Sequence, residues 1–301
     1  MTDARAPHHV LFLTAATMAL FGAVVLAACV VARWRGRSPR SLVAKYLAWF
    51  VIIPPVVLPL AYSRPAFQAV VLLLSLQCLR EFGRVTGLWA DRGVMRLCYL
   101  LTAGMYVPIF AGWPGLHQAG PLVALGVLLI VPIVRGRYEQ MLQKVSLSVL
   151  GVLYFGWFLS HLACVRSLEG GIAAAFFLMV LAACNDALGY LWGTWLGRRP
   201  LSPRISPHKT VEGAVLAAAS VIAVGYLLRG LLPEADGAQA MLLAAMVAVL
   251  AVLGDLVISF IKRDVGVKDM GRAIPGHGGV LDRCDSLILA APVFFHAVGG
   301  L

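Results

Sequence analysis

The chain alternates between long apolar runs and short polar segments along almost its whole length. A run of about 20 apolar residues is long enough to cross a bilayer as a helix. Repeated runs near that length predict an all-α fold, a polytopic helical bundle embedded in a membrane. We predict about ten transmembrane spans, at residues 10–32, 46–62, 66–79, 97–113, 121–134, 145–165, 172–192, 211–228, 239–261 and 284–300.

The second and third predicted spans are short, and Pro54, Pro55 and Pro59 interrupt the second. Proline lacks a backbone N–H and kinks a helix, so a tilted or re-entrant pair stays open as an alternative here. The segment Leu26–Cys29 resembles a lipoprotein cleavage box. Its basic residues follow the apolar run instead of preceding it, so we expect an uncleaved first helix.

Charge supports the same arrangement, because only 13% of the residues are charged and the net charge is +11. Five loops hold 21 of the 25 Lys and Arg residues, at 33–45, 80–96, 135–144, 193–210 and 262–283. Cytoplasmic loops collect basic residues, so we predict that both termini lie outside the cytoplasm. Short basic loops do not form a nucleic-acid surface, and nucleic acid is therefore excluded as a partner. The six cysteines form no CxxC pair and are expected to pack as small apolar residues.

The chain divides into two predicted regions. Residues 1–170 hold N-terminal transmembrane helices with plain basic loops, and residues 171–301 hold a catalytic transmembrane region with cytoplasmic active-site loops. Glu81, the most unusual polar residue of the first region, lies beside Arg80 and Arg84. We interpret it as part of a local charge pair at a helix end.

The segment from Ser259 to Asp285 concentrates the polar chemistry of the chain. Its 27 residues include four Asp, three Arg, two Lys, one His and five Gly. Cations, carboxylates and glycines at this density indicate a site for phosphate and metal. Apolar runs on both sides place that site at a membrane surface.

Three aspartates, Asp186, Asp255 and Asp285, lie within or beside apolar runs. A carboxylate at such a depth is costly and usually faces a polar cavity or a cation. Asp282 lies three residues before Asp285, and this spacing puts both on one face of a helix. With Asp255 on another helix, they predict a Mg²⁺ site, since magnesium prefers a few carboxylates plus phosphate and water. No Cys/His cluster favours zinc.

Two loops are candidates for phosphate binding. The segment Pro275–Gly279 is rich in glycine, which lets backbone N–H groups approach a phosphate closely. The segment 206–213 predicts a helix start, with Ser206 or Thr210 as the cap and Pro207 early in the helix; helix N-termini bind anions. An ordinary helix start and ordinary basic loops remain the alternative interpretation. The cations of the two loops are Lys209, Lys262, Arg263, Lys268, Arg272 and Arg283, and His277 is a candidate for phosphate contact or acid–base work.

These residues resemble the signature of the phosphatidate cytidylyltransferases, also called CDP-diglyceride synthetases. The matching positions are Ser259, Lys262, Arg263, Lys268, Asp269, Gly271, Ile274, Pro275, His277, Gly278, Gly279, Asp282, Arg283 and Asp285. Asn185-Asp186 and the segment 206–213 are also similar to family motifs. The resemblance covers residues 180–290, and the first 170 residues match only in being multi-span. Cys284, Ala217-Ala218 and the ALGY segment after Asp186 depart from the family pattern, which leaves the lipid preference open.

The resemblance implies a nucleotidyltransferase that joins CTP and phosphatidic acid into CDP-diacylglycerol and pyrophosphate, in phospholipid biosynthesis. It implies an integral protein of the bacterial inner membrane with its active site facing the cytoplasm, using Mg²⁺ together with K⁺. The implied catalytic residues are Asp255, Lys262, Arg263, Lys268, His277, Asp282 and Asp285, with Asp255, Asp282 and Asp285 as metal ligands. The implied substrate contacts are Asn185, Asp186, Ser206, Lys209, Thr210, Glu212, Ser259, Gly278, Gly279 and Arg283.

Two other enzymes remain open from the sequence: a CTP-dependent lipid kinase acting on a polyprenol-type alcohol, and a paralogue with a different phospholipid acceptor. A transporter is disfavoured, because the polar cluster lies in loops and no internal repeat is visible. The expected partners are CTP, phosphatidic acid and membrane lipid, and a homodimer is left open.

Overall fold

A computed structural model describes residues 6–34, 50, 52–134, 136, 140–271, 273 and 278–300 of the protein. The fold is a helical bundle with one small hairpin. Its helices are α1 (Ala6–Trp34), α3 (Pro54–Tyr62), α4 (Arg64–Val85), α5 (Arg92–Ala111), α6 (Pro114–Val134), α7 (Met141–Gly151), the π-helical segment η2 (Val152–Phe158), α8 (Leu159–Ser167), α9 (Gly171–Leu196), α10 (Val211–Leu227), α11 (Gly237–Asp264) and α12 (Leu281–Val298). Short 3₁₀ turns lie at Leu88–Ala90 and Arg229–Leu231.

The described part of the chain contains six helices that are long and apolar enough to cross a membrane. They are α4, α5, α6, the helical run Met141–Ser167, α9 and α11. The protein is therefore an integral membrane protein with several helical spans. The figure of about ten spans stays a prediction, because α3 has only nine residues and α10 is a shorter apolar helix. The third predicted span, at 66–79, was too short, since α4 runs unbroken for 22 residues.

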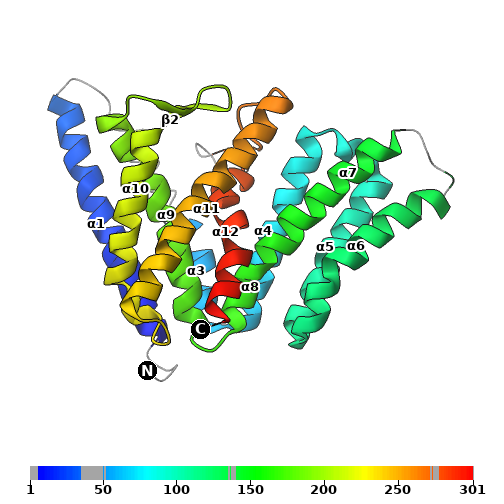
Figure 1. The fold of residues 1–301 in the computed structure, drawn as a ribbon, viewed down its shortest axis with the longest axis horizontal. Coiled ribbons are helices and arrows are strands. Elements are labelled where there is room, and N and C mark those ends of the chain that lie inside the picture. Colours follow the sequence, from blue (N-terminus) through cyan, green and yellow to red (C-terminus); the bar gives the residue numbers. More distant parts are fainter. Residues whose placement is uncertain are drawn as a thin grey trace.

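Successive long helices run up and down the bundle (Figure 1). The start of α1 and the end of α12 lie at one end of the bundle, while β2 and the end of α11 lie at the other. The hairpin, the end of α11 and the start of α12 thus lie at a single end. This arrangement brings segment 206–213 close to the described parts of segment 259–285.

The prediction of an all-α fold missed an antiparallel hairpin, β1 (Pro200–Ser202) and β2 (Ser206–Thr210). Pro207 lies in β2, so its predicted place early in a helix is wrong. The predicted cap is confirmed at Thr210, whose Oγ1 accepts the Gly213 N–H at 3.1 Å. Glu212 closes the hairpin by accepting the backbone N–H groups of Arg198 and Arg199 at 3.0 and 3.1 Å.

Helices α11 and α12 approach each other closely at Gly254. A Cβ on Gly254 would collide with the backbone carbonyl of Asp285. Only glycine therefore allows the two backbones to meet at this level. The contact sets Asp255, the next residue along α11, beside the first turns of α12.

Aromatic side chains fill part of the core. Phe82 packs against Phe155 with ring centroids 5.1 Å apart, and Phe177 packs against Phe294 at 6.1 Å. Large apolar side chains also cover the outside, where Ile133, for example, is 77% exposed. An apolar outer surface suits a protein whose surroundings are lipid.

Candidate active site

Two facing helices carry most of the polar side chains of the site. On α11, Asp255, Ser259 and Lys262 follow one another at spacings of four and three, which places them on one helical face. Ser259 Oγ donates to Asp255 Oδ1 at 3.2 Å. Lys262 Nζ donates to Asp282 Oδ1 at 3.0 Å, and this ion pair joins α11 to α12. The small size of Gly254 lets α11 and α12 come close, and the Lys262–Asp282 ion pair also joins the two helices.

Three carboxylates meet one turn deeper than this ion pair. Asp186 from α9 and Asp255 from α11 lie close enough to Asp285 on α12 for their charges to interact. Ser286 links two of them: its Oγ donates to Asp186 Oδ2 at 2.8 Å, and its backbone N–H donates to Asp285 Oδ1 at 2.8 Å. Asp285 is buried and Asp186 is exposed, so the cluster begins inside the bundle and opens outward. Of the three predicted metal ligands, Asp255 and Asp285 lie near each other, and Asp186, predicted as a substrate contact, is their neighbour; Asp282 lies apart from them at the ion pair with Lys262.

The hairpin supplies the cation nearest to this cluster. Lys209 on β2 forms an ion pair with Asp255 Oδ2. Arg263 Nε donates to the backbone carbonyl of Ile205 at 3.1 Å and ties the hairpin to the end of α11. The segment 206–213 is thereby held against the carboxylates by contacts that sequence spacing could not reveal.

Asp282 has a different environment from Asp285. Its Oδ2 accepts the backbone N–H groups of Met270 and Gly279, each at 3.0 Å, while its Oδ1 faces Lys262. Gly278 has a φ of +81°, a conformation that favours glycine, and it lies against the same carboxylate. Asp282 thus clamps the two ends of the loop between α11 and α12.

The interpretation of Glu81 as a local charge pair is wrong. Arg80 and Arg84 lie over the ring of Trp89, at 5.9 and 5.1 Å from its centroid. Glu81 is buried and turns toward the start of α12, where it accepts the N–H groups of Val280 and Leu281 at 3.1 and 2.9 Å. The partner lies about 200 residues away, so neighbouring charges in the sequence gave the wrong signal.

The remaining predicted residues lie around this centre. Asn185 is buried, and its Oδ1 has no hydrogen-bond partner within the described part of the chain. Ser206 is half-buried in β2, and Lys268, Arg263 and Arg283 are exposed. Thr210 and Glu212 make structural contacts, as the cap of α10 and the closure of the hairpin. His277 and Arg272, together with Ile274, Pro275 and Gly276, lie outside the described residues.

The backbone N–H groups at the described end of the glycine-rich loop already have hydrogen-bond acceptors. Gly279 N–H points to Asp282, and the next two N–H groups point to Glu81. A phosphate at this point would compete with carboxylates that already satisfy these donors. The cations Lys209 and Lys262 are therefore better placed for phosphate than the amides of residues 279–281.

The donor set can be compared with the needs of a metal. Among the described residues, no three His, Cys, Asp or Glu side chains form a ready metal cluster. Magnesium requires only one or two protein carboxylates when substrate phosphates and water complete its shell. Asp255 and Asp285, on facing helices, could supply these two carboxylates. Both oxygens of Asp255 are engaged by protein donors, Ser259 and Lys209, and both oxygens of Asp282 are engaged as well, by Lys262 and two backbone N–H groups.

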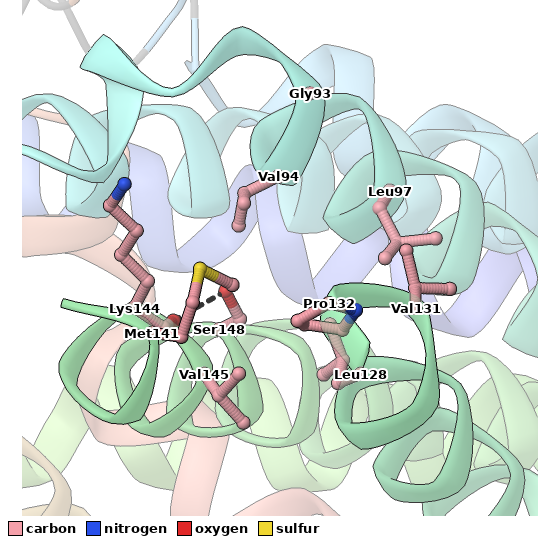
Figure 2. Close-up of a pocket in the computed structure, with 10 residues that line it drawn as sticks. All are labelled: Gly93, Val94, Leu97, Leu128, Val131, Pro132, Met141, Lys144, Val145 and Ser148. Atoms are coloured by element: carbon pink, nitrogen blue, oxygen red, sulfur yellow. Dashed lines mark hydrogen bonds between the residues drawn. The ribbon is translucent and has the colours of Figure 1, made fainter. Parts of the chain in front are cut away.

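A small hollow between α5, α6 and α7 is a different feature (Figure 2). Its lining is mainly apolar, from residues such as Leu97, Leu128 and Val145. Lys144, the cation at its rim, is paired with Asp91 at 3.2 Å. None of the carboxylates of the α11–α12 site lines it, so it contributes nothing to the chemistry of the carboxylate cluster.

Comparison with known proteins agrees with the geometry. Residues 43–300 match the cytidylyltransferase family. The chain belongs to this family. It is 39% identical over 162 residues to the uncharacterized protein YnbB of Escherichia coli K12, covering 50% of this chain and 54% of that protein.

Several relatives carry a functional name. A phosphatidate cytidylyltransferase of Brucella abortus biovar 1 is 38% identical over 146 residues, or 48% of this chain and 54% of the relative. One of Thermotoga maritima is 29% identical over 211 residues, or 66% of this chain and 76% of the relative. The match spans about half the length of the Escherichia coli and Brucella relatives.

The different surroundings of the two α12 aspartates predict opposite effects of one substitution. Asp282→Asn removes one partner of a buried ion pair and should destabilise the protein by about 3 kcal/mol or more. Asp285→Asn removes a charge from a cluster of like charges and should leave the thermal midpoint unchanged or raise it. Thermal unfolding of both variants in detergent with a chelator checks this. An equal loss of stability in the two variants would contradict the assignment.

Proposed function

We propose that the protein transfers the cytidylyl group of CTP to the phosphate of phosphatidic acid, giving CDP-diacylglycerol and pyrophosphate. The observation that carries the proposal is the ion pair between Lys209 and Asp255. It brings the cation of segment 206–213, Lys209, to the carboxylate cluster at one end of the bundle. The names of the Brucella and Thermotoga relatives support the same reaction.

The reaction joins two anions, and the charges of the site suit that problem. An oxygen of the lipid phosphate attacks the α-phosphorus of CTP, and the bond to the bridging oxygen of pyrophosphate breaks. Such a transfer depends on positioning and on electrostatic stabilisation of charge that develops on the phosphates. Lys209 and Lys262 each form an ion pair with a carboxylate of the site. Nucleotide phosphates would take the place of these carboxylates as partners of the two lysines.

The attacking oxygen needs no dedicated base. A lipid phosphate is already anionic near neutral pH, so no proton has to leave before attack. The exposed cations Arg263, Lys268 and Arg283 lie near the loop and suit the leaving pyrophosphate or the lipid headgroup. His277 keeps its predicted role in phosphate contact or acid–base work.

Asp255 and Asp285 would hold Mg²⁺, with Asp186 as their neighbour. The metal would neutralise charge on the nucleotide phosphates and orient them for in-line displacement. The protein's own part is to present two carboxylates at fixed positions, through Ser259, Ser286 and the close approach at Gly254. The resemblance adds K⁺ as a second cation.

We place the protein in a bacterial inner membrane, with the hairpin and the start of α12 facing the cytoplasm and about ten spans in all. The excess of Lys and Arg in the loops at 33–45, 193–210 and 262–283 supports this orientation. CTP is a cytoplasmic nucleotide, so a site on that side also meets its substrate. Both termini then face away from the cytoplasm.

The reaction is tested by the fate of two labels. With phosphatidic acid and Mg²⁺ present, label at the α-phosphate of CTP should enter the lipid. Label at the γ-phosphate should appear in pyrophosphate and never in lipid. Recovery of the γ label in lipid, with CDP released, would establish the kinase alternative, and a panel of lipid acceptors would reveal a paralogue with another substrate.

The proposed metal ligands are tested by Asp→Asn substitutions on α11 and α12, with one matched control on α11. Asp255→Asn and Asp285→Asn should each lower turnover by about a hundredfold or more, because charge stabilisation at the phosphates is lost. Asp264→Asn, at the exposed end of α11, is the control and should remain near wild type. Turnover is measured across a Mg²⁺ titration. Normal Mg²⁺ dependence in both site variants would exclude these residues as ligands.

Orientation is tested by thiol labelling in intact cells. Cysteines introduced as Ser38→Cys and Asp264→Cys should resist a membrane-impermeant reagent until the cells are opened. Glu234→Cys, in the loop before α11, should react from outside. Labelling of either of the first two from outside would reverse the topology.

A further inference from the structure

Helix α12 begins without a cap from its own sequence. Val280 precedes the helix and offers no side-chain acceptor to the first N–H groups. Unpaired donors at a buried helix start cost free energy, and they need a partner from elsewhere. Glu81 of α4 supplies it, accepting the N–H groups of Val280 and Leu281 with its two oxygens at 3.1 and 2.9 Å.

The Glu81 carboxylate is itself fixed. It is 4% exposed, and Gln77 Nε2 donates to its Oε1 at 2.9 Å from one turn earlier on α4. Phe82, the next residue, is buried against Phe155 of η2. The Glu81 side chain therefore has little freedom to move with α12. The position of its carboxylate restricts the position of the first turn of α12.

Two glycines of the loop, Gly271 and Gly279, pack closely against the same carboxylate. A Cβ on Gly271 would lie 2.6 Å from Glu81 Cδ and 2.6 Å from its Oε1, and its three nearest atoms all belong to Glu81. A Cβ on Gly279 would collide with Oε2. Both ends of the loop between α11 and α12 thus rest on Glu81, one before residue 272 and one after residue 277.

The residues that follow in α12 carry the site. Asp282 lies one residue after the capped amides and binds Lys262, and Asp285 lies one turn further in the carboxylate cluster. A rotation or shift of the first turn of α12 would move both carboxylates relative to α11. The negative charge of Glu81 also lies at the positive end of the helix dipole, where it stabilises the helix start.

We propose that Glu81 is a positioning residue of the site: it caps α12 from the N-terminal half of the chain and holds the loop ends and Asp282 and Asp285 in register with α11. It touches no substrate and acts through the backbone N–H groups of Val280 and Leu281. Its effect on turnover rests on the proposed cytidylyl transfer, while its effect on the backbone does not.

The first experiment measures backbone and turnover separately in Glu81→Gln, with the exposed Glu234→Gln as the matched control. The amide keeps the size of the side chain but can accept only through one oxygen. Amide hydrogen exchange in peptides covering 278–285 should accelerate about ten- to a hundredfold without any substrate, since a buried N–H loses its acceptor. Turnover per folded protein should fall with the KM for CTP changed less than kcat, and Glu81→Asp should retain more activity.

Unchanged exchange at 278–285 in Glu81→Gln would overturn the proposal, whatever the activity. Faster exchange in a protein that transfers no cytidylyl group even as wild type would instead overturn the proposed function alone. Faster exchange with turnover equal to that of Glu234→Gln would overturn the role of Glu81 in positioning the reactive groups.

A second experiment uses the fit of Gly271 against Glu81. Gly271→Ala should accelerate exchange at 278–285 and lower turnover in the wild-type background, because the new Cβ collides with the Glu81 side chain. The same change should have little further effect in Glu81→Ala, which removes the colliding atoms. Such coupling is expected only between residues in direct contact. Independent, multiplying effects of the two substitutions would contradict the contact on which the proposal depends.

Discussion

Carboxylates placed against apolar helices need partners, and this constraint organises the whole end of the bundle that carries the site. The Lys262–Asp282 ion pair satisfies one carboxylate and joins α11 to α12. Lys209 satisfies Asp255 and draws the hairpin onto α11. A buried charge without such a partner is strongly destabilising. The ion pairs therefore determine which loops come into contact. The apolar helices determine how deep in the bundle these contacts lie.

Among the buried carboxylates of the site, Asp285 has the fewest described partners to offset the cost of burying its charge. It is buried, it lies beside two further carboxylates, and the donors described for its Oδ1 come only from Ser286. Repulsion among like charges at this position is destabilising. The Mg²⁺ that we propose for the site would relieve that repulsion. Functional sites often keep such local destabilisation, which the rest of the fold offsets.

Much of this could be predicted from the sequence. Apolar run length predicted a helical bundle with several spans. The aspartates in apolar runs and the segment Ser259–Asp285 together predicted that Asp255, Lys262 and Asp285 lie near one another. The hairpin was missed, because a segment of five residues containing Pro207 has too few alternating positions to distinguish a strand from a helix start. The hydrogen-bond partners of Asp282 could not be predicted either, for another reason. Spacing of three residues specifies a shared face of a helix, but not which donors each carboxylate meets.

Glu81 shows most clearly what local patterns cannot predict. Its neighbours in sequence are two arginines, and i to i+3 spacing makes a local charge pair the obvious interpretation. In the fold, the two arginines lie over the ring of Trp89, and the Glu81 carboxylate accepts hydrogen bonds from the start of α12. The signal was present on the other side, in an α12 that begins without Ser, Thr, Asp or Asn at its cap and in glycines at 271 and 279. An uncapped buried helix beside two glycines implies that an acceptor from a distant segment fills the space. The N-terminal half of the chain, which carries no signature of its own, thereby becomes part of the structure that holds the site.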